Sequence, residues 1–340
     1  MYYFKNDYSE ITHPDIMKAL SLHLNDQYEG YGLDRASKSA IQKIQSFLQH
    51  DPSEIYFLEG GTQTNKVAIS SFLRPHEAVI SVETGHIFVH ETGAIENTGH
   101  KVVTVKGIDG KITIDEIQAV LDFHSDEHMV KPKLVYVSQS TEIGTIYHQE
   151  ELLSISKFCR QHHLYLFVDG ARLGSALTAK DNDITLSDLA KWTDAFYIGA
   201  TKNGGLFGEA LVINNPILQQ DMRHLIKQQG AMLAKGFVLG IQFDTLFTNN
   251  LFFDLAKMAN DRAQTIRDEL DRRNTKWFVE TTTNQLFPIF SEQELAVLES
   301  QFGFYRWAEV SPGQFAVRLV TSFATPQSAV DDFVKALQSL

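Results

Sequence analysis

The feature that most constrains this fold is the alternation of short apolar runs with stretches of helical spacing. The runs are short and rich in Val, Ile, Tyr and Phe, which is typical of strands, and they cover residues 55–58, 79–82, 102–105, 134–138, 165–168, 196–199 and 211–214. Helical spacing occurs between them, as over residues 64–73 and 150–162. Such alternation predicts a mostly parallel sheet with helices on both faces. Little chain separates the last two runs, so we expect a hairpin there and a mixed sheet.

After Pro216 the pattern changes to long helices, which we expect over residues 222–247 and 252–273. Two more candidate strands, at residues 284–290 and 315–321, precede a closing helix that begins near Pro326. This pattern predicts a large domain over residues 1–245 and a smaller α+β domain over residues 246–340. The N-terminal segment is a candidate to pack on the small domain.

Composition narrows the class of protein further. The 340 residues are 43% hydrophobic, enough for a large core, and the formal net charge is -12. An acidic surface repels nucleic-acid phosphates and anionic lipid, so we expect neither as a partner. The single cysteine, Cys159, excludes an internal disulfide and fits a reducing compartment. No apolar stretch approaches the roughly 20 residues of a membrane helix. We therefore expect a soluble, cytoplasmic protein.

Two residues that can carry chemistry follow neighbouring predicted strands. Asp169 ends one apolar run, and Lys202 follows the next run among small residues. Taken singly, Asp169 could cap a helix and Lys202 could be a solvated turn residue. Together they meet two needs of pyridoxal phosphate: a lysine forms an imine with its aldehyde, and an aspartate keeps the pyridine nitrogen protonated. In parallel sheets such residues meet at the carboxyl ends of the strands.

A glycine-rich turn and a histidine supply further candidates. Gly60, Gly61 and Thr62 lie between a predicted strand and a helix. Glycine lets the backbone approach a ligand, and amides at a helix start suit a phosphate. A turn of this composition often has no ligand. It gains weight here because pyridoxal phosphate, besides a lysine and an aspartate, also requires a phosphate-binding site. His86 could stack on the cofactor ring, although a lone histidine is more often an ordinary polar residue.

These residues resemble the low-specificity L-threonine aldolases, in the β-eliminating lyase branch of the fold-type-I pyridoxal-phosphate enzymes. The resemblance extends over essentially the whole chain and is strongest around Asp169-Gly170-Ala171-Arg172. The other matching elements are Gly61-Thr62, Gly85-His86 with Glu91, Tyr31-Gly32-Leu33-Asp34, Thr283-Asn284 and Val317-Arg318-Leu319-Val320-Thr321. The resemblance implies an aspartate aminotransferase-like α/β fold, with a large, mostly parallel seven-stranded sheet domain and a smaller C-terminal α+β domain.

The resemblance also implies a role for each matching residue. Lys202 carries pyridoxal 5'-phosphate as an imine and is catalytic, Asp169 holds the ring nitrogen, and His86 stacks on the ring. Phosphate binding falls to Gly61, Thr62, Gln63 and Thr201. Arg172, beside the cofactor, and Arg318 hold the substrate carboxylate, which suits the guanidinium fork.

His128 aligns with a family histidine near the substrate hydroxyl. The alternative, to which we give equal weight, is that His128 is a surface residue without a catalytic role. His86, His128 or a bound water are the candidate bases for that hydroxyl. His124 and His128 also have the spacing of metal ligands on a helix, but no further ligand cluster accompanies them. We therefore expect no metal site.

The chain departs from the family pattern at three positions. Asn6 replaces a serine that contacts the carboxylate, so we expect Asn6 to bind substrate in its place. Leu233 replaces an arginine that reaches a neighbouring subunit's phosphate, and Lys227 or Lys235 would have to substitute for it. Thr201 replaces the serine before the lysine.

The function implied is the cleavage of L-threonine and L-allo-threonine, which are 3-hydroxy amino acids, to glycine and an aldehyde. Because the departures could change substrate choice, β-elimination or transamination on the same cofactor is the alternative. A non-catalytic binding protein is a third hypothesis, against which the presence of both Lys202 and Asp169 argues. The family also implies a small amino-acid substrate and a homodimer or homotetramer.

Overall fold

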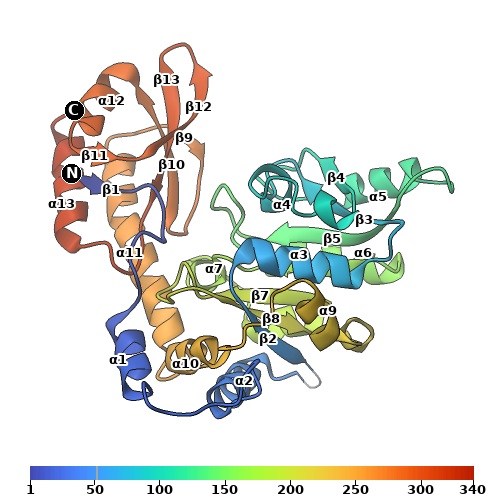
Figure 1. Ribbon diagram of the computed structural model, residues 1–340. Helices are drawn as coiled ribbons and strands as arrows, with labels where there is room; N and C mark the ends of the chain where they lie inside the picture. The colour runs from blue at the N-terminus through green and yellow to red at the C-terminus, as the bar shows by residue number, and fades with distance from the viewer. Residues whose placement is uncertain (51–52) are drawn as a thin grey trace.

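The structure is a computed structural model that describes residues 1–50 and 53–340. A seven-stranded sheet lies at the centre of its larger part (Figure 1), in the order β2-β8-β7-β6-β5-β3-β4. The strands are β2 (Glu54–Leu58), β3 (Glu77–Val82), β4 (Val102–Val105), β5 (Lys131–Ser138), β6 (Tyr165–Asp169), β7 (Ala195–Gly199) and β8 (Glu209–Ile213). β8 runs antiparallel to β2 and β7, and the other neighbours are parallel. The mostly parallel sheet and the hairpin that the sequence predicts are confirmed.

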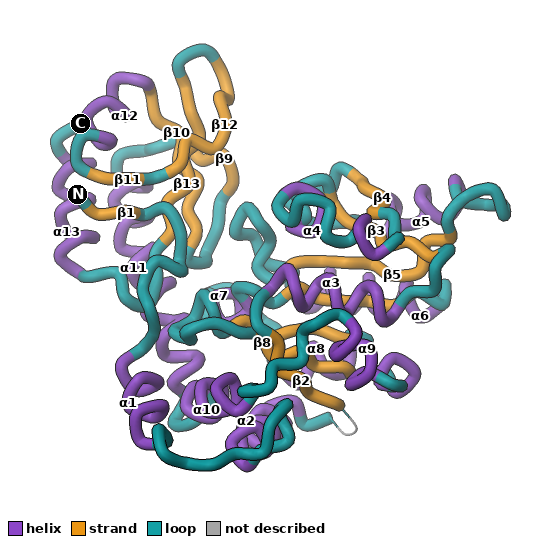
Figure 2. The backbone as a smooth tube through the Cα atoms, in the orientation of Figure 1, coloured by secondary structure: helices purple, strands orange, loops and turns teal. Residues whose placement is uncertain are grey.

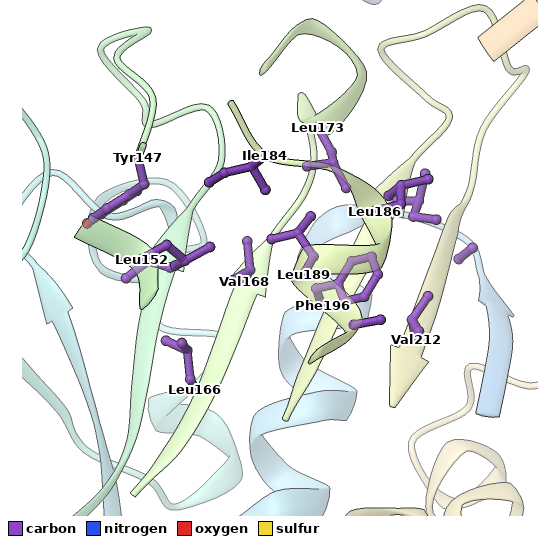
Figure 3. Packing of buried hydrophobic residues seen from close by; sticks show 14 of the residues in the cluster. Tyr147, Leu152, Leu166, Val168, Leu173, Ile184, Leu186, Leu189, Phe196 and Val212 are labelled. Carbon is purple, nitrogen blue, oxygen red and sulfur yellow. The ribbon is translucent and has the colours of Figure 1, made fainter. Parts of the chain in front are cut away.

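Both faces of this sheet are covered, which explains why its strands are almost continuously apolar. Along β6, Leu166 and Val168 pack into one core cluster and Phe167 packs into the other. Figure 3 shows Val168 near Leu189 of a covering helix and Phe196 of β7, with Leu166 farther along β6. The alternation follows from the two-residue period of a strand. A rigid sheet of this kind fixes the positions of the loops at its carboxyl edge.

The helices around the sheet follow the strands in sequence. They are α2 (Arg35–Leu48), α3 (Gly61–Phe72), α4 (His86–Val89), α5 (Ile114–Phe123), α6 (Gln149–Gln161), α7 (Leu173–Leu177), α8 (Leu186–Trp192), α9 (Met222–Gln228) and α10 (Phe237–Leu246), and α1 (Pro14–Leu22) packs on α10. Side chains that accept amide hydrogen bonds mark several of their starts, as Asp34 does for α2 and Thr113 for α5. The helices expected over residues 64–73 and 150–162 correspond to α3 and α6.

The single helix expected over residues 222–247 is wrong, because the structure has α9 and α10 with a loop between them. Gly230 lies in this loop with a φ of 74°, in the left-handed region that ends a helix. The loop packs against the segment that precedes α2: the Tyr31 amide donates to the Ala234 carbonyl oxygen at 3.2 Å. A Cβ on Gly236 would lie 2.9 Å from the backbone nitrogen of Gly32. This tertiary contact overrides the helical spacing.

The smaller part of the chain contains a four-stranded sheet in the order β12-β13-β10-β9 and a two-stranded sheet, β1-β11. Its strands are β1 (Tyr2–Tyr3), β9 (Trp277–Val279), β10 (Gln285–Ser291), β11 (Phe302–Gly303), β12 (Tyr305–Ser311) and β13 (Gln314–Val320), and its helices are α12 (Glu292–Glu299) and α13 (Gln327–Gln338). Figure 2 shows β1 beside β11, far from α1 and α2 that follow it in sequence. Phe4 is buried in the core of this part.

The long helix α11 (Leu251–Arg272) links the two parts. Leu255 near its start belongs to a core cluster of the large sheet, whereas Ile266 and Leu270 belong to the core of the small part. The domain division near residue 245 stays a prediction. None of the described helices combines the length and the apolar character that crossing a bilayer requires.

Candidate active site

A pocket of about 520 Å³ opens at the carboxyl ends of β2, β6 and β7, with the small domain on its other side. This is the edge at which doubly wound sheets bind ligands. Its lining includes most of the predicted site residues: Gly61, Thr62, His86, Arg172, Thr201, Lys202 and Arg318. The fold thus brings together residues separated by more than two hundred positions in sequence.

Asp169 is buried at the end of β6, between the neighbouring strands β5 and β7. Its carboxylate accepts hydrogen bonds from the Tyr136 and Tyr197 hydroxyls at 2.5 Å each. The Asn65 side-chain amide and the Ala171 backbone amide each donate to it at 3.0 Å. Four donors therefore surround a carboxylate that can accept about four hydrogen bonds.

These contacts set the charge of Asp169. Burial alone raises the pKa of Asp169, but the nearby His86 and the two tyrosine hydroxyls outweigh it, so its pKa lies below the usual value. Hydrogen bonds to the charged form of an acid act in this direction. Asp169 is therefore an ionised carboxylate at neutral pH, as an acid must be to pair with a protonated ring nitrogen.

Lys202 lies in the β7–β8 loop and lines the pocket. Burial, followed by the positive charge of Arg172, lowers its pKa to about 8. A lysine with a pKa near 8 carries a much larger fraction of free amine at neutral pH than a solvated one. The free amine is the form that adds to an aldehyde. The Lys202 Nζ also lies 6.0 Å from the ring centre of Tyr8.

The start of α3 faces the same pocket. Gly60, Gly61 and Thr62 line it, and Gly60 caps the helix without any side-chain hydrogen bond. The Gln63 side chain turns away and donates to the Gln229 carbonyl oxygen at 3.2 Å. Within residues 1–50 and 53–340, no hydrogen bond uses the backbone N–H of Gly61, Thr62 or Gln63. The helix start therefore presents free donors and its positive dipole end to an anion.

Two histidines line the pocket within the described part of the chain, His86 and His90, and their ring centres lie 5.4 Å apart. The His86 Nδ1 lies 2.9 Å from the Glu91 carboxylate, and its backbone amide donates to Glu142 at 2.9 Å. The sequence did not single out His90. His90 is an exposed residue, but partial desolvation of its ring by the pocket, followed by the charges of His86 and Arg318, lowers its pKa. His90 is therefore neutral at neutral pH and can accept a proton.

The two predicted carboxylate-binding arginines have different surroundings. The Arg172 Nε and Nη2 donate to the two carboxylate oxygens of Asp7 at 2.7 and 2.9 Å, and both side chains are largely buried. Asn284 also donates to Asp7, at 2.9 Å. The Nε–Nη2 edge of Arg172 is therefore occupied by a residue of this chain.

Arg318, from β13, makes no salt bridge with any described residue and donates only to the neutral Gln285 side chain, at 2.6 and 3.1 Å. Burial, followed by the charge of Arg172, lowers the pKa of Arg318 to about 10. The Trp307 ring lies 5.8 Å from its guanidinium and also lines the pocket. A buried guanidinium without an acidic partner is a strong site for a carboxylate ligand.

Two further predicted residues, Asn6 and His128, lie outside the pocket lining. The Asn6 amide oxygen accepts from the Tyr8 backbone and the Ser9 hydroxyl, which fixes a turn outside the pocket lining. His128 is exposed in the loop before β5. That loop enters the amino end of β5, the opposite edge of the sheet from the pocket.

The positions discussed as arginine substitutes lie away from the Lys202 pocket. Leu233 lines a second cavity together with Arg223, which donates to the Tyr31 carbonyl oxygen at 3.3 Å. The Lys227 Nζ lies 4.7 Å from the Tyr31 ring centre.

A model of the β-eliminating lyase family matches residues 8–293, which include Asp169 and Lys202. The chain belongs to this family. The chain is also similar to the low specificity L-threonine aldolase of Pseudomonas sp., at 28% identity over 339 residues, 98% of this chain and 96% of the relative.

Solved structures extend the comparison. The Leishmania major threonine aldolase is 47% identical with a TM-score of 0.98, covering 100% of this lyase and 99% of that chain. The aspartate aminotransferase of Thermus thermophilus shares the fold, with a TM-score of 0.72 at 15% identity over 98% of this lyase and 89% of that chain. The aspartate aminotransferase-like fold predicted from the sequence is confirmed.

Proposed function

We propose that this lyase is a pyridoxal-phosphate-dependent aldolase that cleaves L-threonine, L-allo-threonine and related 3-hydroxy amino acids to glycine and an aldehyde. One observation carries the proposal: in a chain 47% identical over its full length to a threonine aldolase, the half-buried Lys202 lines the pocket, and the ionised Asp169 lies buried at the end of the neighbouring strand. These are the two groups that the cofactor requires.

The pocket fits pyridoxal phosphate by the chemistry of its donors. Lys202 would hold the aldehyde carbon, Asp169 the ring nitrogen, and the free amides at the start of α3 the phosphate. His86, fixed by Glu91, would lie against the ring. When bound, the cofactor supplies a ring that accepts the electron pair of a bond broken at Cα of the substrate.

The residues of the chain decide which bond breaks. Arg318 lacks an acidic partner and would bind the substrate carboxylate, with Trp307 limiting the space beside it. A fixed carboxylate orients the other bonds at Cα, so that the bond to the hydroxyl-bearing carbon is the one aligned for cleavage. Arg172 contributes by its charge and by anchoring Asp7, rather than as a free fork.

Cleavage requires removal of the proton from the β-hydroxyl group. His90 is the stronger candidate for this base, because it lines the pocket, makes no ring hydrogen bond with any described residue, and has a lowered pKa. Its neutral ring nitrogen would accept the proton as the carbonyl of the aldehyde forms. His86 is bonded to Glu91 and is less free to move a proton. Lys202 would return a proton to Cα before glycine leaves.

Neither β-elimination nor transamination is favoured by a specific contact in the pocket. The expectations of a homo-oligomer and of a cytoplasmic location stay predictions, as does the cofactor role of each residue.

The test mixes the purified, cofactor-loaded protein with L-threonine and with L-allo-threonine. Aldol cleavage yields acetaldehyde and glycine in equal amounts, which a coupled alcohol dehydrogenase and amino-acid analysis measure. Lys202→Ala should abolish both products. Release of 2-oxobutanoate and ammonia would identify β-elimination instead, and amino transfer to an added keto acid would identify transamination.

A further inference from the structure

Glu209 is a buried acid that the proposed function leaves without a role. It is the first residue of β8 and pairs with Leu58 on one side and Gly199 on the other. Its side chain lines the pocket, although the residue is only 3% exposed. Leu211, two positions on, belongs to the core beneath α3, so Glu209 lies on the sheet face that α3 covers.

The two oxygens of Glu209 differ in their contacts. The Oε1 atom accepts a hydrogen bond from the Thr201 hydroxyl at 2.9 Å, and the Thr201 hydroxyl accepts from the Gly208 amide at 2.9 Å. The Oε2 atom is buried and has no hydrogen-bond partner in the described chain. The single O–H of Thr201 is therefore used in the hydrogen bond to Glu209 and is not free to donate to a phosphate.

This arrangement conflicts with an ionised Glu209. The strand β2, which pairs with Glu209 through Leu58, leads directly into Gly60 and Gly61 at the start of α3. The free amides there attract an anion, but a carboxylate in the same small pocket would repel it. A buried carboxylate oxygen without a donor is also costly, because nothing replaces its lost hydration. A neutral carboxylic acid removes the repulsion and costs less to bury than a carboxylate, and it leaves an Oε2–H donor whose acceptor would come from the ligand.

We propose that Glu209 is a neutral carboxylic acid whose Oε2–H donates a hydrogen bond to the phosphate group of the ligand, so that phosphate binding is linked to the protonation of Glu209. The inference rests on the proposed function, since it takes the phosphate to be that of pyridoxal phosphate. The role predicted for the Thr201 hydroxyl passes to Glu209, and Thr201 becomes the residue that orients the acid through Oε1.

The charges around Glu209 support this protonation state. Burial raises the pKa of Glu209 to about 8, with Asp169 adding to the rise and the Thr201 hydroxyl, Lys202 and the Ala200 backbone amide opposing it. The Tyr197 phenol, from β7, also interacts with Glu209, and Glu59 lines the pocket from the end of β2. Glu209 is thus mostly protonated at pH 7 and mostly ionised above pH 9.

The consequence is a pH-dependent affinity for phosphate esters. Well below pH 8, Glu209 is already protonated in the free protein, so phosphate binding requires no proton uptake by Glu209. Above pH 8 each bound phosphate requires Glu209 to take up a proton, so the affinity falls by about tenfold per pH unit. Lys202 also loses its charge near pH 8. The effect of Glu209 is therefore measured as the difference between wild type and a Glu209 variant, both of which retain Lys202.

The experiment measures the Kd of pyridoxine 5'-phosphate from pH 6.5 to 9.5 by titration calorimetry, because this ligand has the phosphate and ring but no aldehyde to react with Lys202. Wild type is compared with Glu209→Gln, whose amide stays a donor at every pH. Glu59→Gln is the matched control, since it removes a carboxylate from the same pocket.

The ratio of the wild-type Kd to the Glu209→Gln Kd should stay constant below pH 7 and rise by about tenfold between pH 7 and pH 9. The Glu59→Gln protein should keep the wild-type pH dependence. A ratio independent of pH, or a pH dependence lost equally in Glu59→Gln, overturns the inference.

A measurement on wild type alone covers the case in which Glu209→Gln fails to fold. Calorimetry at pH 9 in two buffers of different ionisation enthalpy reports the protons taken up on binding, and uptake approaching one proton is expected. Uptake near zero overturns the inference. If wild type binds neither pyridoxine 5'-phosphate nor pyridoxal phosphate at pH 7, the proposed function itself fails. Binding at pH 7 without linked protonation leaves the proposed function standing and removes only the role of Glu209.

Discussion

The two walls of the pocket hold their charged groups in different ways. On the large-domain wall, Asp169 has four hydrogen-bond donors and Arg172 is paired with Asp7 through two bonds. On the small-domain wall, Arg318 is partly buried, and its only acceptor among the described residues is the neutral Gln285. His90 is an exception on the first wall, because its ring has no partner in the described chain.

The difference separates groups that build the pocket from groups that receive a ligand. A charge that is fully paired within the protein stabilises one geometry, and its removal exposes the partner left behind. Burying a charge without a partner costs free energy in the free protein. A bound ligand of opposite charge supplies the missing partner. Paired residues should therefore affect stability when mutated, and unpaired residues should affect catalysis or binding.

Apart from the loss of Lys202, the largest effect on turnover is expected at the unpaired histidine. His90→Asn should lower kcat for L-threonine by about 100-fold or more, because the β-hydroxyl loses its base. His128→Asn is the matched control at the opposite edge of the sheet and should leave kcat unchanged. Steady-state acetaldehyde release measures both. A large loss in His128→Asn with little change in His90→Asn would reverse the assignment.

The largest effect on stability is expected at the paired arginine. Arg172→Met should lower the free energy of unfolding by about 3–5 kcal/mol, because it leaves the buried Asp7 carboxylate without its counter-charge. Urea denaturation measures the loss. The double variant with Asp7→Asn should recover part of it, and equal stability of the wild type and Arg172→Met would contradict the pairing.

Arg318 should show the converse pattern. Arg318→Met should reduce kcat/KM for L-threonine by about 10- to 100-fold, the value of about 1.5–3 kcal/mol for hydrogen bonds to a charged group. Its free energy of unfolding should stay near that of wild type, because no carboxylate loses a partner. Steady-state kinetics and urea denaturation on one preparation separate the two effects. A stability loss as large as that of Arg172→Met would erase the contrast between the walls.

The Asp7 pair also predicts a pH dependence of stability. Burial raises the pKa of Asp7, but Arg172 and Lys202 outweigh it and lower the pKa from 3.8 to about 2. A depressed pKa contributes stability above the unfolded value, here about 2 kcal/mol, which is lost as the pH falls from about 4 through 2. Urea denaturation of wild type should show this loss, and Asp7→Asn should lack this component. An identical acid dependence in both proteins would disprove it.

The smallest effect is expected at Asn6. Asn6→Ala should change stability by no more than about 0.5 kcal/mol and leave KM unchanged, because the side chain only fixes an exposed turn. A marked rise in KM would restore the role in carboxylate binding that the sequence predicted for it.

Much of the fold and of the large-domain wall was predictable from the sequence. Asp169 and Lys202 follow short apolar runs, and parallel strands bring their carboxyl ends to one edge. The pair of Arg172 with Asp7, in contrast, joins residues 165 positions apart, and no local pattern marks it. The residue near the N-terminus that contacts Arg172 is Asp7, whereas the sequence had predicted a site role for its neighbour Asn6.

Other features depended on tertiary packing that sequence patterns do not report. The helix expected over residues 222–247 is interrupted because its middle packs against the Gly32 segment, and Gly230 was the only local sign of a break. Trp307 reaches the pocket from a strand that was not expected. Glu209 lies two residues before the strand expected over residues 211–214, and its position beside α3 follows from the antiparallel register of β8.

The most direct test of the account is to find which amine holds the cofactor. Borohydride reduction of the pyridoxal-phosphate-loaded protein fixes a pyridoxyl group on that amine, and peptide mass spectrometry then identifies it. The account predicts a single modified peptide containing Lys202, and no modification in Lys202→Ala. Modification at another lysine, or none in a protein that cleaves threonine, would contradict the central role of Lys202.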